Sequence, residues 1–303
     1  RRVLFRSYIA VDTVKIDPGN TLSNRNVATS RMADLLGISH MVMKSETQEV
    51  KNGSRKVVGN VMDEADGNAA YDVLADNKVK YSYESVNQIV VMQVFDLICG
   101  QTDRSRDNYY LSTTTNEKTN KSFAKDVFML DNDMSFGNLT DIKAKQGEKR
   151  RIGCMVKFND LLIDTIPPEL KETIKKINNY SKGDLGFILG DILSEEEISN
   201  LKKRIGMISD AIAERETIFK KAAEERKDTD GKIVECMKDP HFRAIRYQYQ
   251  LHKTLKAATA ANKVKKGKIA EFKSEYIREL SYLQYRNMRP FTEVETEYRK
   301  YLQ

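Results

Sequence analysis

The stretch Cys99-Gly-Gln-Thr-Asp-Arg-Ser-Arg-Asp-Asn108 joins a long apolar segment to two runs of β-like residues. Before it, residues 83–99 carry apolar side chains at spacings of three and four, which predicts a buried helix. After it, residues 108–113 and 126–130 resemble strands, and the polar residues 114–125 between them are typical of a hairpin loop. The chain is therefore expected to run from a helix through a glycine and a polar loop into a β-hairpin.

A second polar segment follows the hairpin. It is Phe128-Met-Leu-Asp-Asn-Asp-Met-Ser-Phe-Gly137, and its first aspartate, Asp131, stands 28 residues beyond Asp103. A β-hairpin between the two segments would return Asp131 toward Asp103 and Asn108. Phosphoryl transfer needs a carboxylate that orients the accepting hydroxyl, and it needs oxygen ligands that hold Mg²⁺ against the phosphates. The two segments supply both kinds of group.

The first segment resembles the Gly-x-x-Asp-Arg-His-x-x-Asn loop of the phosphatidylinositol 3-/4-kinase-like group, with Ser105 in place of the histidine. The second resembles the Leu-Asp-Asn-Gly…Phe-Gly segment of the Golgi casein kinases. Taken in this order and spacing, the two segments resemble those of an atypical kinase of the protein-kinase-like superfamily.

This resemblance implies a role for each polar residue of the two segments. Asp103 would be the catalytic base, and Arg104 a cation that either structures the loop or faces a phosphate. Asn108 and Asp131 would be the magnesium ligands, with Asp133 as a third oxygen ligand. The implied cofactors are ATP and Mg²⁺, with Mn²⁺ as an alternative metal. Without the resemblance, Asp and Asn at these positions are also typical of turns.

The resemblance also implies an α+β, two-lobed kinase-like fold. Residues 1–82 would form a reduced, β-rich N-lobe, and residues 83–193 a mainly helical C-lobe that carries both loops. Residues 194–303 would form a helical C-terminal extension.

The expected N-lobe begins with a β-rich run, residues 8–16, that contains Lys15. Lys15 is the candidate for the lysine that pairs with the ATP phosphates, although a solvent-exposed strand lysine fits the same pattern. A helix is predicted from an N-cap at Ser23 to Leu36, closed by Gly37 in the left-handed conformation.

Short strands are predicted around Met41–Met43 and Val57–Met62. The predicted helix 23–36 contains no glutamate to pair with Lys15, and no glycine-rich loop precedes Lys15. These departures favour a second interpretation, a pseudokinase that keeps the fold and serves as an interaction module.

Two other motifs overlap the second segment. Asp131-x-Asp133-x-Ser135 resembles the nucleophile motif of haloacid-dehalogenase phosphatases, which form a phospho-aspartate and need alternating strands and helices downstream. The same residues begin like an EF-hand loop, but Phe136 stands where glycine is required and Ile142 where the closing glutamate belongs. The EF-hand interpretation is therefore excluded.

Beyond Pro167-Pro168 the pattern is helical, with helices predicted near residues 169–179, 195–226, 240–262 and 265–288. Residues 200–303 contain 24 Lys and Arg against 15 Asp and Glu, a surplus of nine positive charges. Basic residues interleaved with tyrosines can bind nucleic acid, an acidic protein or an anionic membrane surface. Their spread around the helices favours a solvated face instead, so nucleic acid is not the expected partner.

Composition sets the remaining limits. The 303 residues are 40% hydrophobic and 31% charged, as in a globular protein, and no apolar run reaches the roughly 18 residues of a membrane span. Three scattered cysteines favour a reducing, cytoplasmic compartment. The opening Arg1–Ser7 resembles a translated adapter sequence, so we expect the native N-terminus upstream, which leaves secretion open.

The combined prediction is an ATP-dependent phosphotransferase that binds a nucleotide and acts on a protein or other hydroxyl-bearing acceptor. The alternative is the pseudokinase, whose basic helical tail would contact an acidic partner. The sequence does not indicate the acceptor or the oligomeric state.

Overall fold

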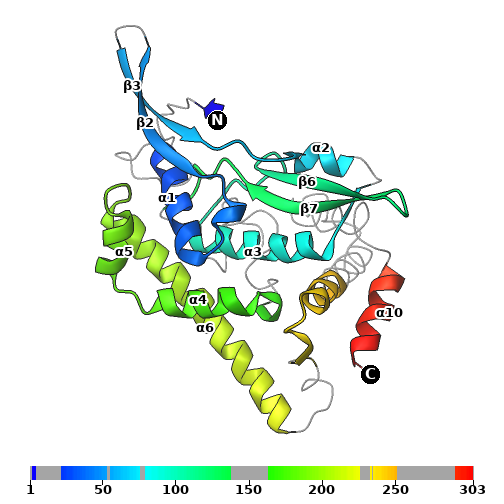
Figure 1. The fold of residues 1–303 in the computed structure, drawn as a ribbon. Coiled ribbons are helices and arrows are strands. Elements are labelled where there is room, and N and C mark those ends of the chain that lie inside the picture. The colour runs from blue at the N-terminus through cyan, green and yellow to red at the C-terminus, as the bar shows by residue number, and fades with distance from the viewer. Residues whose placement is uncertain are drawn as a thin grey trace, which may run out of the picture.

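The computed structural model describes residues 2–4, 22–52, 55–75, 79–137, 163–225, 233, 235–250 and 291–302, and all structural statements below concern these residues. They form an α+β fold in which helices pack around two small sheets (Figure 1). The predicted strand with Lys15, the residues 138–162 and the predicted helical residues 251–290 lie outside this part of the chain.

The helices account for most of the described chain. Their bounds are α1 (Leu22–Leu36), α2 (Ala70–Ala75), α3 (Tyr83–Cys99), α4 (Pro168–Asn178), α5 (Lys182–Leu189), α6 (Glu195–Glu224) and α10 (Phe291–Leu302). Residues 240–250 are also helical, and short 3₁₀ turns cover Ser39–Met41 and Ile163–Thr165.

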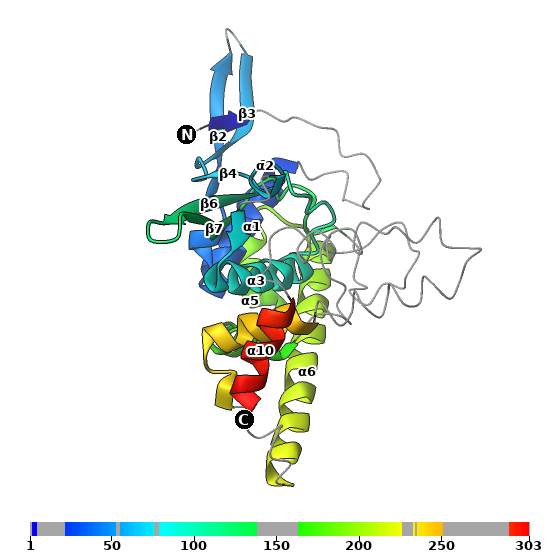
Figure 2. The same ribbon diagram turned by 90° about the vertical axis from the view of Figure 1, so that its right-hand side faces the viewer.

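The strands form two separate sheets. The first has the order β1-β3-β2 and the second the order β4-β6-β7-β5. Their bounds are β1 (Arg2–Leu4), β2 (Ser45–Asn52), β3 (Arg55–Met62), β4 (Asn68–Ala69), β5 (Val79–Tyr81), β6 (Tyr109–Asn116) and β7 (Lys121–Met129). The β2–β3 hairpin projects from the body of the molecule in both side views (Figures 1 and 2).

Helix α3 forms where the apolar periodicity predicts it. Its N-cap, Ser82, accepts a hydrogen bond from the Ser85 N–H, and Gly100 closes it with a φ of 71°. This left-handed conformation favours glycine because other residues would bring Cβ against the backbone. The helix lies beneath the β6–β7 hairpin and leads directly into the polar loop that begins at Gln101 (Figure 1).

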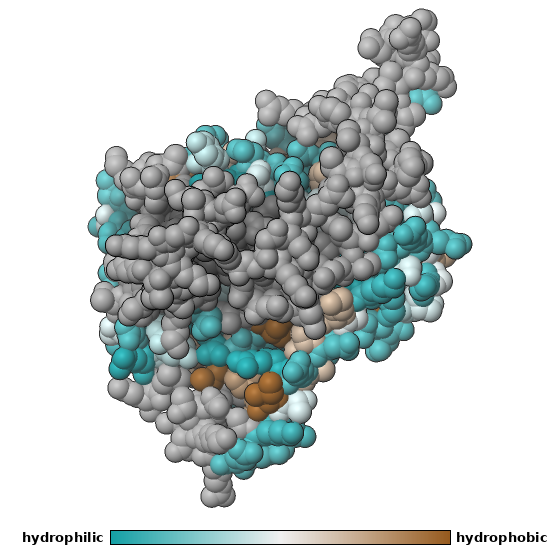
Figure 3. Space-filling view, turned by 180° about the vertical axis from the view of Figure 1, so that it is seen from behind, coloured by the Kyte–Doolittle hydropathy of each residue, from teal (hydrophilic) through white to brown (hydrophobic). Residues whose placement is uncertain are grey.

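The apolar core is continuous across the predicted subdivisions of the chain. It joins α1, α3, β6, β7, α4 and α6, and α6 contributes Leu201, Ile205, Ile208 and Ile212. These spacings of three and four place the four residues on one helical face. Because α6 belongs to the same core as α3, the packing gives no support to a boundary at residue 194. On the face seen in Figure 3, the described residues are mostly hydrophilic, as expected when the apolar side chains lie inside.

Several predicted element bounds are wrong. The predicted strand at Met41–Met43 is instead a 3₁₀ turn and a single bridge from Val42 to Met129, and the strand begins at Ser45. All three of the predicted strand's residues are buried, so they lack the alternation of a strand with one solvated face. Ser23 lies inside α1 rather than at its N-cap, whereas Gly37 does close the helix, with a φ of 72°.

Two further differences have local causes. The β6–β7 hairpin is confirmed, but its connection covers only residues 117–120, because the threonine-rich run after Leu111 extends β6 to Asn116. Helix α5 was not predicted, since two glycines lie within its eight residues and a third follows its end; a capping box between Ser181 and Asp184 starts it.

None of the described helices combines the length and the apolar character that a membrane span requires.

Candidate functional site

The two polar segments meet at the open end of the β6–β7 hairpin. The strand register pairs Tyr109 with Met129, and just beyond this pair the Leu130 N–H donates to the Asn108 carbonyl at 3.0 Å. The residue after Leu130 is Asp131. The hairpin therefore returns Asp131 to the neighbourhood of Asn108, as the sequence predicts.

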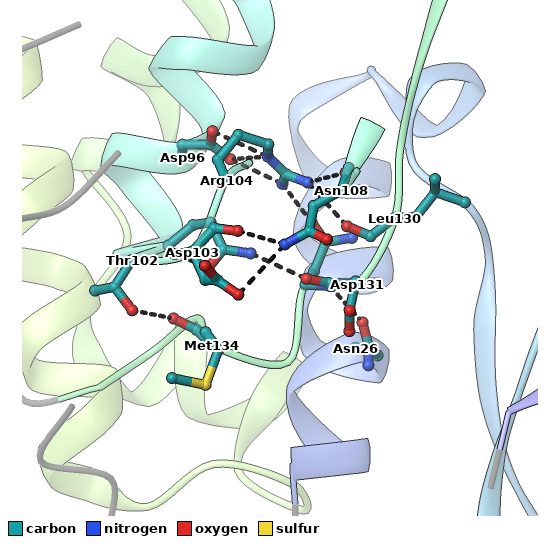
Figure 4. A network of polar contacts seen from close by, with 11 residues as sticks. Asn26, Asp96, Thr102, Asp103, Arg104, Asn108, Leu130, Asp131 and Met134 are labelled. Carbon is teal, nitrogen blue, oxygen red and sulfur yellow. Dashed lines mark hydrogen bonds and ion pairs between the residues drawn. The ribbon is translucent and has the colours of Figure 1, made fainter. Parts of the chain in front are cut away.

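Asn108 connects this end of the hairpin to Asp103. Its side-chain Nδ2 donates to the Asp103 carbonyl at 2.5 Å and lies 3.4 Å from the Asp103 carboxylate Oδ2. Asn108 is buried, whereas Asp103 is exposed. In Figure 4 the amide oxygen of Asn108 lies on the side of Leu130 and Asp131, opposite to its bonds with Asp103. The amide thus stands between the two predicted acidic residues.

Gln101 holds both predicted acidic residues through their backbones, and sequence reasoning missed it. Its Oε1 accepts from the Asp103 N–H at 2.9 Å, and its Nε2 donates to the Asp131 carbonyl at 3.3 Å. Gln101 is buried, so water does not compete for these bonds. One side-chain amide therefore links residues 101–108, the Asp103 loop, to residues 131–137, the Asp131 segment.

Arg104 is buried beneath the site, where its guanidinium bonds to groups of the protein. Its Nε lies 3.1 and 3.2 Å from the two carboxylate oxygens of Asp96, and its Nη2 donates to Asp96 at 2.9 Å. Its Nη1 donates to the carbonyls of Asn108 at 2.6 Å and Leu130 at 2.8 Å, and its Nη2 also donates to Asn132 Oδ1 at 2.5 Å. Of the two roles that the resemblance left open, the burial of Arg104 supports the structuring one.

The partner carboxylate, Asp96, lies on the last turn of α3 and is also buried. Burial raises the pKa of Asp96, and the guanidinium of Arg104 acts in the opposite direction. A buried ion pair of this kind depends on both partners, because either charge alone would be left without compensation in a medium of low polarity.

Helix α1 supplies two more residues that the sequence did not mark. Asn26 Oδ1 accepts from the Asn132 N–H at 2.8 Å, next to Asp131. Arg25 donates to the Ser135 carbonyl and forms an ion pair with Glu197 of α6, and both side chains are fully buried. Helix α1 is therefore bonded to the polar segment at two points.

The remaining predicted residues have different outcomes. Asp133 is buried in the turn that follows Asp131. Lys15 lies outside the described residues.

The haloacid-dehalogenase interpretation required alternating strands and helices after Asp131, but residues 163–225 contain helices and no strand. The strand before Asp131 is also half of an antiparallel hairpin.

The two segments contain oxygen donors of the kinds that hard divalent cations prefer, carboxylates and an amide. Among the described residues, no group of three or more His, Cys, Asp and Glu side chains could hold a metal ion alone. Magnesium commonly takes only one or two carboxylates and completes its octahedral shell with phosphate oxygens and water. Asp131, with the amide oxygen of Asn108, fits that pattern.

Comparison of the sequence with models of known protein families gives no match, and comparison with curated proteins gives none either. The function must therefore be argued from the site itself.

Gly100 offers a direct test of how tightly the start of the loop is packed. A Cβ at Gly100 would lie 2.9 Å from Arg204 Cζ, whereas a Cβ at Gly37, which has nearly the same φ, would meet nothing within 4 Å. We expect Gly37→Ala to lower the free energy of unfolding by about 1 kcal/mol through backbone strain alone. Gly100→Ala should lower it by about 1–3 kcal/mol more, because overpacking is added.

Urea titration of both variants measures this difference, with the wild-type protein as reference. Equal losses in the two variants would show that Arg204 does not restrict the space beside Gly100.

Proposed function

We propose that the protein is an ATP-dependent phosphotransferase with a two-lobed, kinase-like fold that acts on a protein or other hydroxyl-bearing acceptor. The observation that carries this proposal is the position of Asn108, whose backbone bonds to Leu130 and whose side chain bonds to Asp103. Through it, the exposed Asp103 is connected to the strand end that leads into Asp131, which lies 28 residues further along the sequence.

The proposed division of roles follows from exposure and neighbours. Asp103 is exposed, so its carboxylate can accept a hydrogen bond from the hydroxyl of an acceptor that approaches from solvent. Asn108 and Asp131 would hold Mg²⁺ or Mn²⁺, with Asp133 as a further candidate and Lys15 as the candidate for pairing with the ATP phosphates. When bound, the metal ion would supply positive charge that stabilises the phosphate oxygens during transfer.

Backbone strain near Asp131 supports a functional role for this segment. Asp131 has a φ of 48° and the buried Phe136 a φ of 58°. Such conformations are uncommon outside glycine, above all for a bulky aromatic residue, and they concentrate at sites where the surrounding structure enforces them. The bonds from Gln101, Asn26 and Arg25 described above supply that enforcement.

The arrangement of elements supports the kinase-like fold that we propose. Strands β2 and β3 lie toward one end of the molecule and helices α4 and α6 toward the other, with the β6–β7 hairpin and α3 between them (Figure 1). The two polar segments lie at this middle level, where a nucleotide would bind between lobes.

One observation favours the pseudokinase as a second candidate. Two α1 side chains reach the segment after Asp131, the cation Arg25 and the uncharged amide Asn26, and α1 contains no glutamate that could pair with a lysine. An amide can orient the backbone of this segment, but it cannot form an ion pair. In this interpretation the protein would bind nucleotide without transferring phosphate.

A thermal-shift titration tests the proposal with Mg²⁺ alone, ATP alone and both together. We expect a substantial rise in melting temperature only with both present, because the metal site is completed by phosphate oxygens. At a nucleotide concentration about 100 times Kd the stabilisation should be about 2.7 kcal/mol, which corresponds to a rise of several degrees.

Transfer of the γ-phosphate of radiolabelled ATP to a mixed protein acceptor or to water then separates the two candidates. Binding with transfer supports the phosphotransferase, and binding without transfer supports the pseudokinase. The absence of any joint effect of Mg²⁺ and ATP would overturn both.

A further inference from the structure

Helix α6 presents two charged side chains to the interior, directly behind the candidate site. Glu197 and Arg204 are both fully buried, and Arg204 is one of the largest fully buried side chains. They are seven residues apart, which is two helical turns, so they project from the same face of α6. A charged side chain in the interior needs a bonding partner. The bonds of Glu197 and of Arg204 both connect α6 to the segment that contains Asp131, residues 131–137.

Glu197 is fixed by the start of its own helix. One of its carboxylate oxygens accepts from the Ser194 N–H at 2.9 Å, while the Ser194 Oγ accepts from the Glu197 N–H at 3.3 Å, which is a capping box. The other oxygen binds Arg25, which also donates to the Ser135 carbonyl. Arg25 thus connects Ser135 to the first turn of α6.

Arg204 holds the two backbones that flank the site. Its guanidinium donates to the carbonyls of Ile98 at 2.8 Å and Cys99 at 3.4 Å, at the end of α3, and to Gly137 at 3.4 Å. Burial lowers the pKa of Arg204 to about 10, so the side chain remains charged at neutral pH. These carbonyls at the C-terminus of α3 favour a positive charge.

Between these two points the segment is bonded to the Asp103 loop itself. The Phe136 N–H donates to the Cys99 carbonyl at 2.7 Å, and the Thr102 N–H donates to the Met134 carbonyl at 3.2 Å. Of the residues on either side of the strained Phe136, Gly137 is bonded directly by Arg204 of α6, and Ser135 is bonded by Arg25, which pairs with Glu197 of α6. The conformation of the whole segment therefore depends on where α6 lies.

We propose that Glu197 and Arg204 are positioning residues that form a clamp from α6, which sets the position of the Asp131 segment against the Asp103 loop. The expected effect of this clamp on the binding of magnesium and nucleotide rests on the proposed function. Neither residue touches the ligands; the clamp acts through Arg25, Ser135, Gly137 and the end of α3. Any contact that shifts α6 would then change the metal site.

The test uses the full chain with Arg204→Lys, which keeps the charge but loses the planar guanidinium that spans three carbonyls. The control is Lys203→Met, at the neighbouring exposed position of α6. The first measurement is amide hydrogen exchange at Thr102 and Phe136 without ligand. The second is the Mg²⁺ concentration that gives half of the ATP-dependent thermal shift.

We expect Arg204→Lys to speed exchange at both amides about 10-fold or more and to raise the half-saturating Mg²⁺ concentration by about 10–100-fold, as for other groups that orient metal ligands. The control should change neither. A purely structural role would lower the melting temperature without changing the Mg²⁺ dependence, and that result would overturn the clamp. So would unchanged exchange at both amides.

If Arg204→Lys does not fold, Glu197→Gln takes its place, because the amide keeps the shape of the side chain and one acceptor for Arg25. The same two measurements, with the same expected directions, then decide the question. If the wild-type protein shows no joint effect of Mg²⁺ and ATP, the proposed function fails, whereas the exchange measurement still decides whether α6 holds the segment.

Discussion

Replacing Asp131 by asparagine is expected to abolish the joint stabilisation of the protein by Mg²⁺ and ATP. The substitution removes a negatively charged oxygen ligand while it keeps almost the same shape, and magnesium depends strongly on such ligands. Loss of a group that only orients a ligand costs about 10–100-fold in metal affinity, so loss of the ligand itself should cost about 100-fold or more. The thermal shift measured across a Mg²⁺ titration provides the test.

The matched variant is Asp103→Asn, at the exposed carboxylate 28 residues earlier. We expect it to keep the joint thermal shift and to lose phosphoryl transfer by about 10²–10⁴-fold, the usual contribution of a general base. Asparagine can still accept a hydrogen bond, but it cannot take the proton from the acceptor hydroxyl. Equal loss of nucleotide binding in both variants would contradict this division of roles.

The second large effect concerns stability and follows from the buried pair of Asp96 and Arg104. Arg104→Met keeps the length of the side chain but leaves the Asp96 carboxylate buried without its cation, and it removes donors from the carbonyls of Asn108 and Leu130. Breaking a buried pair in this way costs about 3–5 kcal/mol. We therefore expect a loss of this size in the free energy of unfolding, measured by urea titration.

This loss should depend on pH in a defined direction. Burial raises the pKa of Asp96 above its usual 3.8 and Arg104 lowers it, so without Arg104 the effect of burial is unopposed. A carboxyl with a raised pKa in the folded protein is tolerated there as the neutral acid. The folded protein is therefore favoured at low pH, and this stabilisation is lost as the pH rises through the folded-state pKa of Asp96. Arg104→Met should therefore be less destabilised near pH 4 than near pH 8.

An exposed ion pair serves as the control for this experiment. Arg31 and Asp191 approach within 2.5 Å, but both side chains are substantially exposed. Arg31→Met should cost about 1 kcal/mol or less, because water and salt compensate the lost interaction. If Arg104→Met cost no more than Arg31→Met, the buried pair would not be what holds the loop.

The local signals in the sequence determined α3, its end at Gly100 and the β6–β7 hairpin. They could do so because each depends on nearby residues: an apolar period of three to four, a glycine at the helix end and β-like runs around a polar turn. The meeting of Asp103, Asn108 and Asp131 follows from the hairpin, since a hairpin returns its end beside its start. That part of the candidate site was therefore predictable.

Only the tertiary structure decided what surrounds those residues. Four charged residues are buried around the site, Arg25, Arg104, Arg204 and Glu197, and the sequence analysis assigned a role only to Arg104. Their burial depends on partners far away in the chain, such as Arg25 with Glu197, 172 residues apart. Burial of a charged side chain is favourable only where the interior supplies a partner of opposite charge or a hydrogen-bonding group in the right geometry. The local sequence does not show which distant residue that partner is. Helix α6, which the resemblance assigned to a C-terminal extension, is likewise part of the same apolar core as α3.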